Sequence, residues 1–182
     1  MKKYCASILS GLALAGGIIQ SAEASVCQSL PGSVVCGAGV VEQLSGKGTV
    51  TVNGTTVNGP TNVNGLLSAT DASFSNIDIN GSANFIQCTI NGEASIKGSL
   101  NASSTKFESS LEIYSNEVRF INSKISGDLH VSHTDSRKHV VFLDNFSEVG
   151  GNIVFDDKNG EVVIRGGSKV NGQIIGGNSV AR

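Results

Sequence analysis

Bulky apolar residues recur every five or six positions through most of this chain. The series includes Phe74, Ile79, Phe85, Ile90 and Ile96. An interval this short is too brief for helices and leaves strands of only three or four residues. Strands this short bury an apolar face only by stacking on their counterparts in neighbouring coils. The spacing therefore predicts an all-β, single-domain parallel β-helix, or β-solenoid.

Asn-Gly pairs punctuate the same interval and raise the alternative of a chain of β-hairpins. Only three residues separate Gly54 from Asn58, and only four separate Gly59 from Asn64. Hairpins with strands this short could not bury a core. The corner of a solenoid needs only one or two residues at positive φ, which Gly and Asn tolerate best. The pairs therefore favour solenoid corners.

The coil length is predicted from residues that recur at a fixed step. Gly65, Gly81, Gly98 and Ser115 step by 16, 17 and 17 residues, which indicates a three-sided coil of about 17 residues. A four-sided coil of about 22 residues is the alternative, because one apolar series keeps that step. That series is Phe74, Ile96, Val118, Val140 and Val162.

Residues 83–96 and 118–131 align without a gap at an offset of 35, which equals two of the shorter coils. We therefore favour the 17-residue coil and expect seven or eight coils. We also expect one set of aromatic side chains to stack in the core. This set is Phe74, Phe85, Phe107, Phe120 and Phe142.

The periodicity of residues 49–177 resembles that of the bactofilins, a class of right-handed triangular β-helices. The resemblance rests on short Gly-punctuated coils with one inward aliphatic residue per face. It implies a cytoskeletal polymer whose subunits join through their solenoid ends. Bactofilins work inside the cell, whereas this chain begins with an export signal. The expectation is therefore a shared architecture rather than a shared biology.

The first 24 residues are typical of a bacterial secretory signal peptide. Lys2 and Lys3 precede an apolar stretch from Ile8 to Ile19, and Ala22-Glu23-Ala24 offers a cleavage site. The apolar stretch has 12 residues, whereas a membrane-spanning helix needs about 20. We therefore expect an exported mature chain, periplasmic or extracellular, that does not span a membrane.

The mature chain divides into three predicted segments: an N-terminal cap (25–48), the solenoid (49–177) and a C-terminal tail (178–182). Export to an oxidising compartment predicts a disulfide between Cys27 and Cys36 across the Pro31-Gly32 turn. Cys88 lies inside a repeat unit and is expected to be a buried small apolar residue.

Charge and motifs exclude several functions. Residues 25–182 carry 11 basic and 14 acidic side chains without a basic cluster, so no nucleic-acid partner is expected. No nucleophile, phosphate-binding or cofactor motif is present, and we expect no cofactor and no enzyme activity. A polysaccharide-acting enzyme is the second alternative, since carboxylates such as Glu93 and Glu112 could meet on one face.

Two polar stretches, 132–138 and 156–160, interrupt the spacing. The first offers a possible interaction loop with His133, Asp135, Arg137 and Lys138. His130, His133 and Asp135 also suggest a metal site. His130 lies between Leu129 and Val131, however, so it should point outward, and a fourth ligand is lacking. A solvated loop without metal is the prediction.

The C-terminal end is a possible assembly site. Ile174 and Ile175 still follow the repeat, and few residues remain to cover the coil that they close. Either residues 178–182 fold over this coil, or the open end docks on a second copy. We expect an exported, non-catalytic β-solenoid with a structural or self-assembling role in the cell envelope or extracellular space. The first alternative is an adhesin-like or carbohydrate-binding surface module.

Overall fold

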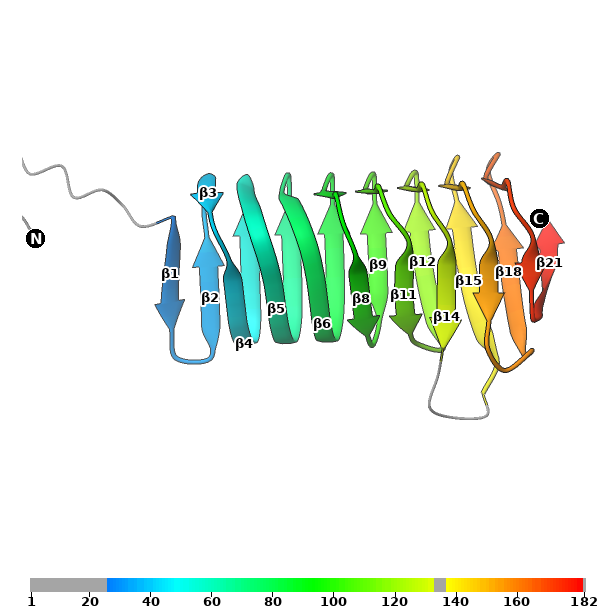
Figure 1. Ribbon diagram of the computed structural model, residues 1–182, viewed down its shortest axis with the longest axis horizontal. Coiled ribbons are helices and arrows are strands. Elements are labelled where there is room, and N and C mark those ends of the chain that lie inside the picture. The colour runs from blue at the N-terminus through cyan, green and yellow to red at the C-terminus, as the bar shows by residue number, and fades with distance from the viewer. Residues whose placement is uncertain (1–25, 133–136, 182) are drawn as a thin grey trace, which may run out of the picture.

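The computed structural model describes residues 26–132 and 137–181, and within these ranges the chain forms a parallel β-solenoid of about nine turns (Figure 1). The strands stack side by side along the long axis, from β1 at one end to β21 at the other. The predicted all-β fold is confirmed. The parallel register begins at Ser33 and extends through Ala181, so the ladder is longer than the expected seven or eight coils. The predicted signal peptide lies outside the described residues.

Three walls, here called faces A, B and C, enclose the core. Face A contains β2 (Ser33–Cys36), β9 (Leu100–Ser103), β12 (Glu117–Ile121), β15 (His139–Asp144), β18 (Gly160–Ile164) and β21 (Gly177–Ala181). Face B contains β3 (Gly39–Val41), β7 (Thr89–Ile90), β10 (Lys106–Phe107), β13 (Lys124–Ile125), β16 (Glu148–Val149) and β19 (Lys169–Val170). Face C contains β8 (Ala94–Lys97), β11 (Leu111–Tyr114), β14 (Leu129–Ser132), β17 (Ile153–Phe155) and β20 (Ile174–Ile175). The long strands β4 (Leu44–Asn53), β5 (Thr55–Thr70) and β6 (Ser73–Ile86) bend at the corners and serve more than one face.

The strand register confirms a coil of about 17 residues. Ala83 pairs with Leu100, and Leu100 pairs with Val118, at separations of 17 and 18 residues. The step widens to 23 from Val118 to Val141 and to 21 from Val141 to Val162. These wider steps contain the two polar interruptions, and in the second of them residues 156–159 lie between β17 and β18, outside any strand. The 22-residue alternative is therefore wrong as a general coil length.

Four of the five predicted core phenylalanines stack inside the solenoid. Phe74 and Phe107 enter from face B, whereas Phe85 and Phe120 enter from face A, and all four are buried. Successive ring centroids lie 6.0, 6.1 and 6.2 Å apart in edge-to-face geometry, which is a favourable arrangement for aromatic pairs.

The prediction for Phe142 is wrong, because this side chain points outward from face A. Val141 pairs with Val118, and Leu143 pairs with Phe120, so Val141 and Leu143 take the two inward positions of β15. Side chains alternate between the two sides of a strand, which leaves Phe142 on the outside. The polar residues that precede β15 interrupt the apolar spacing, so this register is not apparent from the sequence.

A column of small polar residues lines the corner between faces A and B. The backbone N–H groups of Thr105, Ser123 and Ser147 each donate to a hydroxyl of the next coil, at 3.1, 3.2 and 3.0 Å. These contacts satisfy polar groups that the turn of the backbone leaves buried. Cys88 lies in the same column and is buried, as predicted, and burial raises the pKa of its thiol.

At the N-terminal end, β1 (Cys27–Leu30) pairs antiparallel with β2. The predicted disulfide is confirmed: Cys27 and Cys36 are joined, with an S–S distance of 2.04 Å. The Val26 carbonyl oxygen also accepts a hydrogen bond from the Gly37 N–H at 2.8 Å. Disulfides form and persist in oxidising environments, so this bond is consistent with export.

Candidate functional site

The C-terminal end exposes both backbone and core. Among the described residues, β21 pairs with β18 alone, so its outer edge carries unpaired backbone groups. Ser179 occupies the inward position above Val162 but is exposed. Ile174 is half-buried, and Ile175 is 46% exposed on the outside of face C. The last coil is thus an uncovered layer of the solenoid.

The sequence of β21 lacks the residues that oppose pairing with another strand. Gly177–Ala181 contains no charged residue and no proline, and natural edge strands use both to prevent association. Residues 178–181 are the start of the expected tail, and they continue face A as a strand instead of crossing the end of the coil. The open-end alternative therefore gains support from the position of β21.

Two of the four predicted loop residues can be placed. Lys138 Nζ donates to Glu161 Oε2 at 2.6 Å, and Arg137 faces the side-chain amide of Asn116. His133 and Asp135 lie outside the described residues. Within residues 26–132 and 137–181, no cluster of three or more His, Cys, Asp or Glu side chains could hold a metal ion. His130 points outward from face C, as predicted, and is exposed.

A buried histidine joins the two interruptions of the coil. His139 is fully buried at the start of β15, and its Nδ1 lies 3.0 Å from the Ser115 carbonyl oxygen. Its Nε2 lies 3.3 Å from Asp157 Oδ2, and its backbone N–H donates to Asn159 O at 3.1 Å. Asp157 and Asn159 belong to the second interruption. His139, which directly follows the first interruption, therefore holds the second interruption (156–160) in place.

Face C carries a shallow groove of about 620 Å³. Asp78, Glu93 and Glu112 line it, together with the exposed Pro60. Asp78 and Glu112 lie in one outward column, two strands apart, with Ser95 between them. Glu93 and Glu112, which the sequence left open as a pair, line the same groove but are not cross-strand neighbours. Glu93 precedes Ala94, which pairs with Leu111, so Glu93 lies beside Ser110 at the corner.

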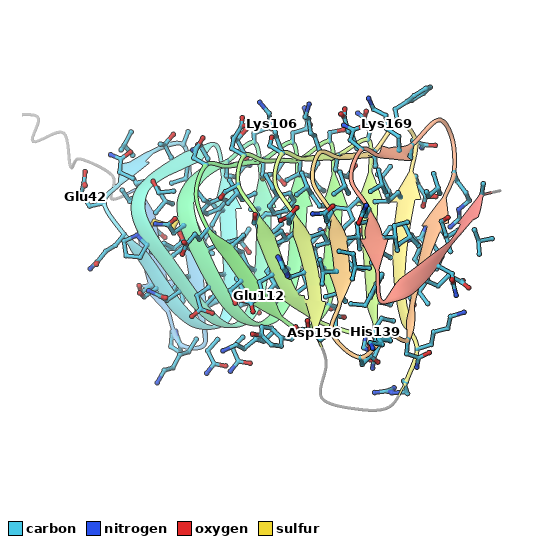
Figure 2. The ribbon with its side chains drawn as sticks, turned by 45° about the vertical axis from the view of Figure 1, so that its right-hand side comes forward. Glu42, Lys106, Glu112, His139, Asp156 and Lys169 are labelled. Atoms are coloured by element: carbon cyan, nitrogen blue, oxygen red, sulfur yellow. A yellow bond between two sulfur atoms is a disulfide. The ribbon has the colours of Figure 1, made fainter. Side chains whose placement is uncertain are left out.

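The side chain of Tyr114 is bound to this groove through Glu112. The Tyr114 hydroxyl donates to Glu112 Oε1 at 2.6 Å, and this bond raises the pKa of Tyr114. Figure 2 shows Glu112 on the broad face of the solenoid, whereas Lys106 and Lys169 lie along one edge. That edge is face B, so the acidic groove and the lysines occupy different sides of the molecule.

Face A carries a charged cluster that the sequence analysis missed. Asp144 pairs with two arginines: Oδ2 with Arg119 Nη1 at 3.0 Å, and Oδ1 with Arg165 Nε at 2.8 Å. Both guanidinium groups lie over the Phe142 ring, at 4.6 and 5.2 Å from its centroid. The four residues come from three successive coils, so no short sequence motif could have revealed them.

A second groove, of about 580 Å³, runs along face A and ends at Arg119. Asn84 and Asn101 line it, together with Ser82 and Ser99, whose hydroxyls are 2.8 Å apart. Amides, hydroxyls and a guanidinium are groups that bind neutral polar ligands. This groove is the feature of the structure that best fits the carbohydrate-binding alternative.

Phe146 is the most exposed of the large apolar side chains in the described part of the chain, at 76%. It lies in the corner between β15 and β16 and has a φ of +63°, which is unfavourable for a residue with a Cβ. A Cβ placed on Gly167 of the next coil would come 2.7 Å from a ring carbon of Phe146. The ring therefore packs against the bare backbone of Gly167.

No protein-family model, curated protein or solved structure matches this chain. The likeness to the bactofilins therefore rests on coil periodicity and the β-solenoid architecture alone. In the part of the chain that the structure describes, no helix is long and apolar enough to cross a membrane.

Proposed function

We propose that this protein is an exported, non-catalytic β-solenoid that acts as a stiff structural rod and self-associates through its C-terminal end. One observation carries the proposal: β21 offers an uncharged, unpaired strand edge beside an uncovered core layer. Pairing with a second copy would satisfy the backbone groups of that edge. It would also remove Ile174 and Ser179 from water.

The distribution of exposed apolar side chains supports contacts at the ends. Seven large apolar side chains are exposed in the described residues, and four of them lie on the first or last coil. These four are Leu30, Val35, Val40 and Ile175. The other three, Leu66, Ile86 and Phe146, lie along the middle of the rod.

The cell envelope or the extracellular space is the proposed location. The predicted signal peptide and the Cys27–Cys36 disulfide both support export. A surface-exposed rod with a carbohydrate-binding side is the second candidate, and the face A groove beside Arg119 supports it. The two candidates use different surfaces: self-association uses the C-terminal end of the solenoid, and carbohydrate binding uses face A.

Light scattering and electron microscopy of residues 25–182, across a range of concentrations, test the first candidate. We expect end-to-end dimers or filaments that disappear when Ile174 and Ile175 are both changed to lysine. Ile86→Lys is the matched control, since Ile86 is a similarly exposed isoleucine on the outside of face A, far from the ends. A chain that stays monomeric at every concentration would overturn the proposal and favour a screen of glycans.

A further inference from the structure

Phe146 combines two unfavourable features: a positive φ and an exposed aromatic ring. The next coil places Gly167, also at positive φ, at the equivalent position, so this corner suits glycine and not phenylalanine. The preceding coil turns the same corner with one residue fewer: two residues separate Ile121 from Lys124, whereas three separate Asp144 from Glu148. Phe146 is an extra residue in this corner, and strained outliers of this kind often mark functional positions.

The charges around Phe146 are arranged symmetrically and are positive overall. Asp144, two residues before it, is shared by Arg119 and Arg165. Glu148, two residues after it, is shared by Lys124 and Lys169, at 3.7 and 3.3 Å. Four cationic side chains therefore surround two carboxylates. We call Phe146 with these six neighbours the Phe146 corner; it presents an aromatic ring within a net positive field.

The groove on face C has the complementary properties. Asp78, Glu93 and Glu112 line it, and its lining within the described residues includes no lysine or arginine. Pro60, which is exposed, also lines it, and its volume of about 620 Å³ is ample for a phenylalanine side chain. It therefore offers apolar contact for an aromatic ring and carboxylates for the cations that flank the ring.

We propose that the Phe146 corner docks into the face C groove of a second copy of this chain, which produces a lateral contact between rods. The corner between faces A and B lies opposite face C in a three-sided coil, so one copy cannot fill its own groove. A contact between two different patches is heterologous and does not close on itself, so it can extend from copy to copy. This contact is separate from the end contact proposed above and shares with it only the premise of self-association.

The test uses residues 25–182 with Ile174→Lys and Ile175→Lys, which removes the proposed end contact. Any association that remains then reports on the lateral contact alone, and a failure of one proposal can be told from a failure of the other. Phe146→Asn removes the ring, and asparagine suits the positive φ, so this variant should fold at least as well. Glu112→Lys reverses a charge in the groove. Sedimentation velocity should show association of the background chain and at least about tenfold weaker association of either variant alone. Glu117→Lys, an exposed charge reversal on face A, is the matched control.

Mixing the two variants gives the decisive measurement. The Phe146→Asn chain retains an intact groove, and the Glu112→Lys chain retains an intact Phe146 corner. A heterologous contact predicts that the mixture forms one-to-one dimers and nothing larger. A mixture that stays monomeric while the background chain associates would overturn the proposal, as would a Phe146→Asn chain that associates normally. A monomeric background chain that binds anionic lipid vesicles through Phe146 would assign the corner to a membrane surface instead.

Discussion

Gly81 lies directly above Gly65 of the preceding coil, so close that a Cβ on Gly81 would come 1.9 Å from the Gly65 carbonyl oxygen. The same relationship recurs in the corner between faces C and A, where Gly65 approaches Gly48 and Gly98 approaches Gly81. Gly81 also has a φ of +144°, which side chains rarely tolerate. This column therefore permits the tight stacking of the early coils.

Gly81→Ala should lower the free energy of unfolding by about 3 kcal/mol, because the methyl group meets backbone that cannot move aside. Urea denaturation followed by circular dichroism would measure the loss. Gly37→Ala is the matched control, since a Cβ on Gly37 has no heavy atom within 4 Å. Equal stabilities of the two variants would contradict this account of the corner.

An inward and an outward phenylalanine should lose different amounts of stability when changed to alanine. Phe85 is fully buried between Phe74 and Phe107, so Phe85→Ala should lose about 3–5 kcal/mol of stability. Phe142 lies outside the coil beneath two guanidinium groups, so Phe142→Ala should lose only about 1–2 kcal/mol. Thermal unfolding of both variants would check this difference. A larger loss for Phe142 would mean that the side chain belongs to the core.

Sequence alone was sufficient for the architecture, because every coil must place apolar residues inward at the same interval. The gap-free alignment at an offset of 35 reflects a real stack: Phe85 pairs with Ala102, and Ala102 with Phe120. Each inward side chain packs against the coil before it and the coil after it, so apolar residues recur in the sequence at the coil spacing.

The parts that could not be predicted depend on loop lengths. Extra residues between strands lengthen the step from one coil to the next, so the spacing alone does not reveal the register of the strand that follows. The uncertain register led to the wrong prediction that Phe142 is a core residue. It also concealed the cluster around Asp144, whose partners Arg119 and Arg165 lie 25 and 21 residues away in sequence.

Loss of the disulfide should loosen the N-terminal end only. Cys27→Ser with Cys36→Ser removes a bond that stabilises the closed loop by about 2–3 kcal/mol. Each coil contacts only its neighbours, so the effect should fade within one or two coils. Hydrogen exchange should show faster exchange in β1 and β2 and unchanged protection in β12. Global unfolding of the double variant would contradict this local role.

Cys88→Ser should be tolerated, with a change of less than about 1 kcal/mol. The Sγ of Cys88 lies 3.3 Å from the Ile86 carbonyl oxygen, and a serine hydroxyl could donate to the same group. Thr105 in the next coil makes the equivalent contact, donating to the Ser103 carbonyl oxygen at 3.0 Å. Chemical denaturation would measure the change. Cys88→Leu, which adds volume to a column of small residues, should be clearly destabilising by comparison.

Glu148 should titrate below the ordinary carboxyl value in the folded protein. Asn171 donates to Glu148 Oε1 at 2.8 Å and Lys169 also binds this carboxylate, which lowers the pKa of Glu148 from 4.5. A lowered folded pKa means that the contribution to stability is present above pH 4.5 and is lost as the pH falls through the folded value. NMR titration of the Glu148 carboxyl should show this midpoint, and Asn171→Ala should raise it. The Glu108 carboxyl is the internal control, because its pKa is lowered chiefly by Lys106 and should not respond to the same substitution. A Glu148 midpoint that stays fixed in Asn171→Ala would assign the shift to the lysines instead.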